Sequence, residues 1–222
     1  MKIRTTEQLI EAVAGEIAWR RRELTDLRFL VESVEGNRTR EAVVTRAAVA
    51  LLYAHWEGFV KAAAEIYLQF VAMQRCRNSE LTDSMLAIAL RSKLQAAQGS
   101  KKITIHTTVV EFFRTQMQKQ SSLPYKDVVC TEANLSSTVL LEILRSLGLS
   151  TEDYESKSHL IDSHLLAKRN HIAHGSALSV ETKDYLTLHD EIVNLISLFR
   201  NQIENAAVTR GYLLPGEIPT HN

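Results

Sequence analysis

The densest group of side chains capable of chemistry is the run Lys168-Arg169-Asn170-His171-Ile172-Ala173-His174-Gly175. Apolar spacing before and within this run predicts a helix over about 156–174, so the polar groups occupy its last two turns. Histidine exchanges protons near neutral pH, and arginine stays cationic and offers a planar fork of donors to phosphate oxygens. Such side chains suit proton transfer beside a bound phosphate.

The spacing within this run limits what one helix can do. Asn170 and His174 are four residues apart, so they share a face. Arg169 and His174 are five apart, which rotates one from the other by about 140°. One straight helix therefore does not direct both at the same atom. A long arginine side chain, a distorted helix end or a second copy of the helix is needed.

Each of these residues also has a purely structural explanation. Arg169 stabilises the helix dipole or pairs with an acid, and His174 caps free carbonyls beside Gly175, the predicted left-handed terminator. His171 and His174, with His164 earlier on the same side, are a conceivable metal site. A zinc site needs further ligands at fixed spacing, and no Glu-x-x-His pair is present. We therefore predict no metal and no cofactor.

Long helices are predicted to position this run. A seven-residue apolar repeat over about 7–35, broken only by Arg20 and preceded by a capping box of Thr5 and Gln8, predicts a first helix of about eight turns. The remaining predictions are helices over about 39–76, 81–98, 136–147 and 182–208, with a loop over 103–110 that leads into a helix to about 119.

The composition fits one soluble helical domain. Among 222 residues there are only 8 Gly and 3 Pro, which argues against an all-β fold, and the 2 Cys are too few for a disulfide framework. The sequence lacks a signal peptide and an apolar run of about 18 residues, so we expect a cytoplasmic protein that does not enter the membrane. The predicted fold is all-α: an up-and-down bundle over 1–210 with a smaller helical insertion at about 79–150. The tail, 211–222, is expected on the surface.

Two stretches resemble the HEPN superfamily. Arg169-Asn170-x-x-x-His174, at the end of a late helix, is similar to the Arg-x4–6-His motif of that superfamily, in whose nuclease members Asn follows Arg. On an early helix, Tyr53-Ala54-His55-Trp56-Glu57-Gly58-Phe59 resembles the matching region of the MAE-type branch. The segment Ile172-Ala173-His174-Gly175 agrees with the same branch.

The resemblance implies a metal-independent endoribonuclease that acts as a homodimer with a composite active site. RNA carries its own nucleophile, the 2′-OH, so cleavage needs a base, an acid and positive charge. The resemblance gives these roles to His174 and Arg169, with Asn170 as an orienting residue, and places His55, Glu57, His171 and Lys168 around them in support. It also suggests a toxin or phage-defence effector that cuts cellular RNA and has an antitoxin partner.

Other interpretations of the sequence stay open. The chain is alternatively a non-catalytic helical module that binds RNA, nucleotide or a protein partner. His55 is alternatively a core histidine, and Glu57 with Lys61 a solvated ion pair. The formal net charge is zero, so RNA steering needs a local cluster. Two basic segments are candidates for such a cluster, although both are alternatively ordinary protein surface. They are residues 20–22 and the stretch 75–102, which contains Arg75, Arg77, Arg91, Lys93, Lys101 and Lys102.

Overall fold

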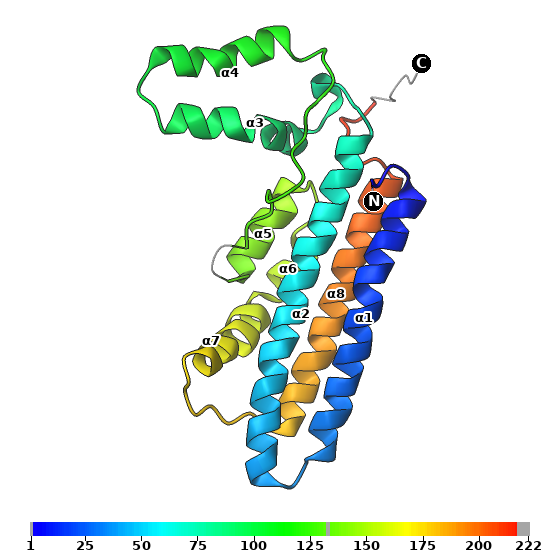
Figure 1. Ribbon diagram of the computed structural model, residues 1–222, viewed down its shortest axis with the longest axis vertical. Helices are drawn as coiled ribbons and strands as arrows, with labels where there is room; N and C mark the ends of the chain where they lie inside the picture. The colour runs from blue at the N-terminus through cyan, green and yellow to red at the C-terminus, as the bar shows by residue number, and fades with distance from the viewer. Residues whose placement is uncertain (1, 132–133, 217–222) are drawn as a thin grey trace.

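The structure is a computed structural model that describes residues 2–131 and 134–216. All the named secondary-structure elements in these ranges are helices. Three long helices lie side by side and contact one another along the bundle (Figure 1). They are α1 (Thr6–Ser33), α2 (Arg38–Met73) and α8 (Thr182–Val208). The all-α bundle predicted from the sequence is confirmed.

The shorter helices divide into two groups, as Figure 1 shows. One group packs beside α2, and the other is a helical hairpin that projects from one end of the bundle. The first group is α5 (Ser137–Ser146), α6 (Glu152–Glu155), the π-helix η2 (Leu160–Leu166) and α7 (Ala167–Ala173). The second is the short 3-10 helix η1 (Asn78–Glu80) followed by α3 (Asp83–Gln98) and α4 (Ile103–Thr115).

Helix α1 forms for the reasons read from its sequence. Its capping box is present, because Gln8 N–H donates to the Thr5 hydroxyl and Thr5 N–H donates to the Gln8 side chain. The buried stripe includes Arg20, whose guanidinium pairs with Glu16 and lies 4.3 Å from the Trp19 ring centre. An arginine fits this buried position because Glu16 pairs with its charge and the flat face of its guanidinium stacks on the Trp19 ring.

Two features of the helices differ from the sequence prediction. Helix α4 begins at Ile103, where a loop was expected; the hydroxyls of Thr107 and Thr108 donate to carbonyls three residues earlier, so these β-branched residues are accommodated. Ile10 and Leu51, whose spacing in the apolar patterns of the first two helices predicts burial, are 39% and 41% exposed. Both lie at the edges of stripes whose centres are filled by neighbouring leucines.

The start of the C-terminal tail is packed rather than exposed. Tyr212 and Leu213 are buried, and the Tyr212 ring meets Phe70 edge-on at 5.9 Å. The backbone is also tied down: Thr82 N–H donates to the Tyr212 carbonyl at 3.0 Å, and Leu214 N–H donates to the Glu80 carbonyl at 2.9 Å. The expectation of a surface tail is therefore wrong for this segment, and residues 217–222 lie outside the described ranges.

Removing the Tyr212 side chain is expected to destabilise the protein. Tyr212→Ala vacates a buried aromatic site at the base of the hairpin and should cost about 3 kcal/mol in the free energy of unfolding by urea. Leu214→Ala is the control, since Leu214 is 38% exposed and only its backbone bonds to Glu80. It should cost about 0.5 kcal/mol or less. Equal losses in the two variants would contradict a packed tail.

No helix in the described ranges combines the length and the apolarity that a bilayer crossing requires.

Candidate functional site

The arginine–histidine cluster lies on α7, directly after the π-helix η2. A π turn holds one more residue than an α turn, and such turns are frequent at functional sites. Ile161 and Leu165 of this π segment are fully buried and anchor it against the bundle. The extra residue rotates everything that follows by about 100° relative to an unbroken α-helix. It precedes the cluster, so the spacing of Arg169 and His174 is unchanged.

Arg169 is half-buried and held in one place by three groups. Its Nη1 donates to the Oδ1 of the adjacent Asn170 at 2.8 Å and to the Oδ1 of Asn134. Its Cζ lies 4.5 Å from the centre of the Tyr53 ring, in the stacking arrangement that guanidinium prefers. Both oxygen partners are neutral amides, so these two contacts orient the positive charge of Arg169 without neutralising it.

Tyr53 joins the parts of this site. It is buried on α2, and its hydroxyl accepts a hydrogen bond of 2.7 Å from the Leu135 N–H, which fixes the chain beside Asn134. Burial raises the pKa of Tyr53 to about 12, and the Glu57 carboxylate raises it as well. The Leu135 N–H and the charge of Arg169 act in the opposite direction and lower the pKa of Tyr53. The phenol therefore stays neutral near pH 7, so it does not offset the positive charge of Arg169.

His174 lies at the end of the helix and is exposed. Gly175 has φ of 76° and terminates the helix in the left-handed conformation, as predicted from the sequence. The reversal is closed by Gly175 N–H donating to the Ile172 carbonyl and Ser176 N–H donating to the His171 carbonyl. The His174 ring makes no hydrogen bond or ion pair with any residue in the part of the chain described. It remains available to a ligand or to a second chain.

The two other polar residues of the run lie in different settings. His171 is exposed on α7. Lys168 is half-buried and lines a hollow of about 410 Å³ against α8, together with His164 and Asp184. The His164 ring packs edge-on against His159, with 4.9 Å between ring centres. Over residues 2–131 and 134–216, no three His, Cys, Asp or Glu side chains gather in an arrangement that fits a metal ion.

His55 points to the opposite side of α2 from Tyr53, because two residues turn a helix by about 200°. Its Nε2 lies 3.1 Å from the Glu23 carboxylate of α1, and its ring lies 5.3 Å from that of Trp19. Burial lowers the pKa of His55, and the positive charge of nearby Arg20 lowers it further. The Glu23 carboxylate acts in the opposite direction and raises this pKa. The structure therefore sets His55 at the α1–α2 interface, whereas Glu57, one turn after Tyr53, acts on the Tyr53 hydroxyl.

Two residues that contact Arg169, Tyr53 and Asn134, were not predicted from the sequence. Tyr53 stood inside the Tyr-x-His-Trp-Glu stretch but was not singled out, although an aromatic residue two positions before a buried histidine lies on the other face of the helix. Asn134 carried no sequence signal, because it is 35 residues from Arg169 and lies outside any helix. Both contacts depend on how α5 and α7 pack beside α2.

The chain matches a known protein family. A family model described as MAE_28990-like HEPN matches residues 9–212. This span covers the three long helices, the projecting hairpin and the α7 cluster. No curated protein and no solved structure matches the chain.

Proposed function

Because the chain belongs to the MAE-type HEPN family, we propose that it is a metal-independent endoribonuclease whose catalytic residues are Arg169 and His174, with Asn170 as a positioning residue. The observation that carries the proposal is the state of Arg169. Its guanidinium is oriented by Tyr53, Asn134 and Asn170 and forms no ion pair with any carboxylate of the residues that the structure describes, and the exposed His174 follows five residues later. A cation held in one place, together with an exposed histidine, suits a phosphodiester.

The reaction uses the nucleophile that RNA supplies. A histidine takes the proton of the 2′-OH, the 2′ oxygen attacks the adjacent phosphorus, and the bond to the 5′ oxygen breaks. The histidine, now protonated, gives that proton to the 5′ oxygen, so the products are a 2′,3′-cyclic phosphate and a 5′-hydroxyl. Arg169 stabilises the charge on the phosphorane oxygens, because a guanidinium fork matches two of them.

The separation of Arg169 and His174 on one helix favours a homodimer. Five residues turn the two side chains about 140° apart, and a second copy related by a twofold axis would bring its His174 to the Arg169 of the first.

The biological role follows from the activity. An endoribonuclease without a metal requirement suits a toxin or phage-defence effector in the cytoplasm, restrained by an antitoxin protein until it is released. The second candidate function is a non-catalytic module that binds RNA, nucleotide or protein. The full occupation of the Arg169 Nη1 by two amide oxygens favours that candidate, because the same contacts also suit a purely structural arginine.

The test is RNA cleavage in the presence of EDTA by the wild type and by His174→Ala. We expect wild-type cleavage to survive chelation, and His174→Ala to lose about 100-fold or more in rate, the range for removal of a general acid–base group. The released 5′ fragment should end in a 2′,3′-cyclic phosphate. His159→Ala, which removes another exposed histidine, is the matched control. Binding of RNA by the wild type without turnover would support the non-catalytic module instead.

A further inference from the structure

The hairpin of α3 and α4 is the most basic part of the chain. Residues 83–119 hold six basic and only two acidic residues, a formal net charge of +4 in a protein whose total is zero. Figure 1 shows that this hairpin projects from the bundle, so its sides face solvent. The basic residues are Arg91, Lys93, Lys101, Lys102, Arg114 and Lys119, and all but Arg91 are exposed.

These cations are not engaged by acids of the protein. Within residues 2–131 and 134–216, none of the six forms an ion pair. The other basic segment of the sequence differs. Arg20 is buried and pairs with Glu16, and Arg21 donates to Ser197 of α8. The hairpin therefore offers the stronger unpaired positive field, which attracts a polyanion.

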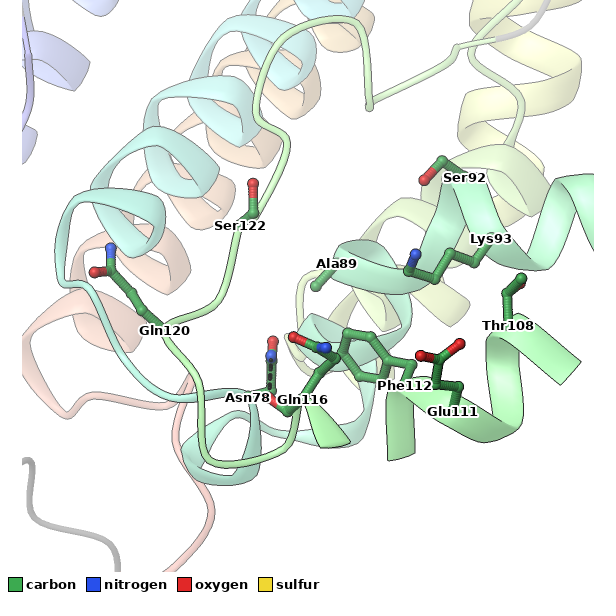
Figure 2. A pocket seen from close by; sticks show the side chains of 10 residues that line it. All are labelled: Asn78, Ala89, Ser92, Lys93, Thr108, Glu111, Phe112, Gln116, Gln120 and Ser122. Carbon is green, nitrogen blue, oxygen red and sulfur yellow. Dashed lines mark hydrogen bonds between the residues drawn. The ribbon is translucent and has the colours of Figure 1, made fainter. Parts of the chain in front are cut away.

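A polar hollow of about 530 Å³ lies between the two helices at the base of the hairpin (Figure 2). Lys93 borders it from α3, Glu111 and Phe112 from α4, and Asn78 and Gln116 from the segments that join the hairpin to the bundle. The volume is in the range of small-ligand sites. Amide groups beside an aromatic ring match a nucleobase, whose edge carries donors and acceptors and whose face is apolar.

Asn78 gives this hollow a preference for ligands that carry a hydrogen-bond donor. The residue is 4% exposed, and its side-chain amide donates to the Gln116 carbonyl at 2.9 Å, which fixes the direction of the amide. Its Oδ1 is buried without a partner in the described part of the chain. A buried acceptor without a hydrogen bond is costly, so a donor entering the hollow would be favoured. The exocyclic amine of adenine, cytosine or guanine is such a donor.

We infer that the α3–α4 hairpin is the arm that captures single-stranded RNA, with phosphates along its lysines and one unstacked base in the hollow. The inference rests on the proposed function in one respect only, that RNA is the substrate. Lys101 and Lys102 hold the backbone at the tip, Lys93 meets a phosphate at the mouth of the hollow, and Asn78 Oδ1 accepts from the amine of the base. This site is separate from the Arg169 cluster on α7.

Binding, rather than cleavage, tests the arm. Short single-stranded RNA of mixed sequence is titrated into Arg169→Ala protein, followed by fluorescence anisotropy at several salt concentrations. Adding Lys101→Glu with Lys102→Glu should raise Kd about tenfold or more and lower the slope of log K against log salt by roughly 1 to 1.5. The matched control, Arg21→Glu with Arg22→Glu, makes the same charge change on an exposed pair of α1 and should shift Kd by less than about twofold.

The base pocket has its own test in the same background. Oligo(A) and oligo(C) should bind about tenfold more tightly than oligo(U), whose base lacks an exocyclic amine. Ser92→Trp places a large ring in the hollow from an exposed position and should remove that preference, with the thermal melting temperature unchanged. Equal binding of all three oligomers would overturn the assignment of Asn78.

Two results would overturn the arm itself. Equal losses in the lysine pair and the arginine pair would mean that RNA senses only the overall charge. Unchanged binding in the lysine variant would leave the exposed apolar residues Ile103, Val110 and Phe113 as the contact surface of the hairpin, for a protein partner. Failure of the nuclease proposal is detected separately, as absence of cleavage by the wild type, because these titrations use a variant that lacks Arg169.

Discussion

Arg169→Ala is expected to reduce RNA cleavage about 1000-fold while the protein stays folded, because the substitution removes the charge that stabilises the phosphorane. The loss should appear in kcat/KM and largely in kcat, since the charge on the phosphoryl oxygens grows on the way to the transition state. The side chain is only half-buried and its guanidinium packs on the face of Tyr53, so the melting temperature should change little. The measurement is the initial rate on labelled RNA, with circular dichroism to follow folding.

Arg169→Lys separates charge from geometry. Lysine keeps the charge but cannot stack as a plane on Tyr53 or present two parallel donors, so we expect a rate still about tenfold or more below wild type. Asn134→Ala removes one anchor of the guanidinium and should cost less than Arg169→Ala. Arg145→Ala is the control, an exposed arginine on α5. Retention of more than about a tenth of the wild-type rate by Arg169→Ala would make Arg169 a structural residue.

Helix ends were predictable from the sequence because their causes are local. The predicted 182–208 helix is α8 (Thr182–Val208) to the residue, and the predicted 81–98 helix, α3, ends at Gln98 with Gly99 as its C-cap. Gly148 and Gly175, which directly follow the predicted ends of their helices, both adopt positive φ. In each case a residue type and its nearest neighbours decide the backbone conformation, so no knowledge of tertiary packing is needed.

The site was predictable only in part because its contacts are not local. The sequence identified Arg169, Asn170 and His174 through their spacing, but not Asn134, which approaches from a loop 35 residues earlier. The π-helix before α7 is equally hidden, since periodicity cannot distinguish an α turn from a π turn over one step. His55 was assigned to the site because it lies in the same stretch as Tyr53, yet the helix turns the two apart.

The packed tail shows the same limit. A segment with two prolines after a long helix has the composition of a surface tail, yet the Tyr212 ring packs against Phe70, 142 residues earlier in the chain. This contact closes the base of the projecting hairpin, because the tail backbone also bonds to residues 80 and 82. The start of the tail, which was expected on the surface, thus supports the part of the protein that we assign to RNA capture.

Mixing two inactive variants is expected to restore cleavage, because we propose that each site combines Arg169 of one subunit with His174 of another. The 140° between these positions on one helix separates the two side chains within a single chain. A heterodimer of Arg169→Ala and His174→Ala subunits would then contain one intact site and one doubly mutated site. An equal mixture should reach roughly a quarter of the wild-type rate, since half of the dimers are mixed and each has one working site of two.

The reciprocal heterodimer makes the test decisive. Wild type paired with the double variant Arg169→Ala/His174→Ala carries the same two substitutions, but every cross-subunit site in it lacks one residue. Purified with a different tag on each subunit, this pair should be inactive if the sites form between subunits, whereas the pair of single variants should be active. If the sites lie within one subunit, the two pairs exchange behaviour, and a monomer by light scattering at micromolar concentration would contradict the composite site directly. Because both heterodimers have the same composition, only the arrangement of Arg169 and His174 across the twofold axis can account for a difference between them.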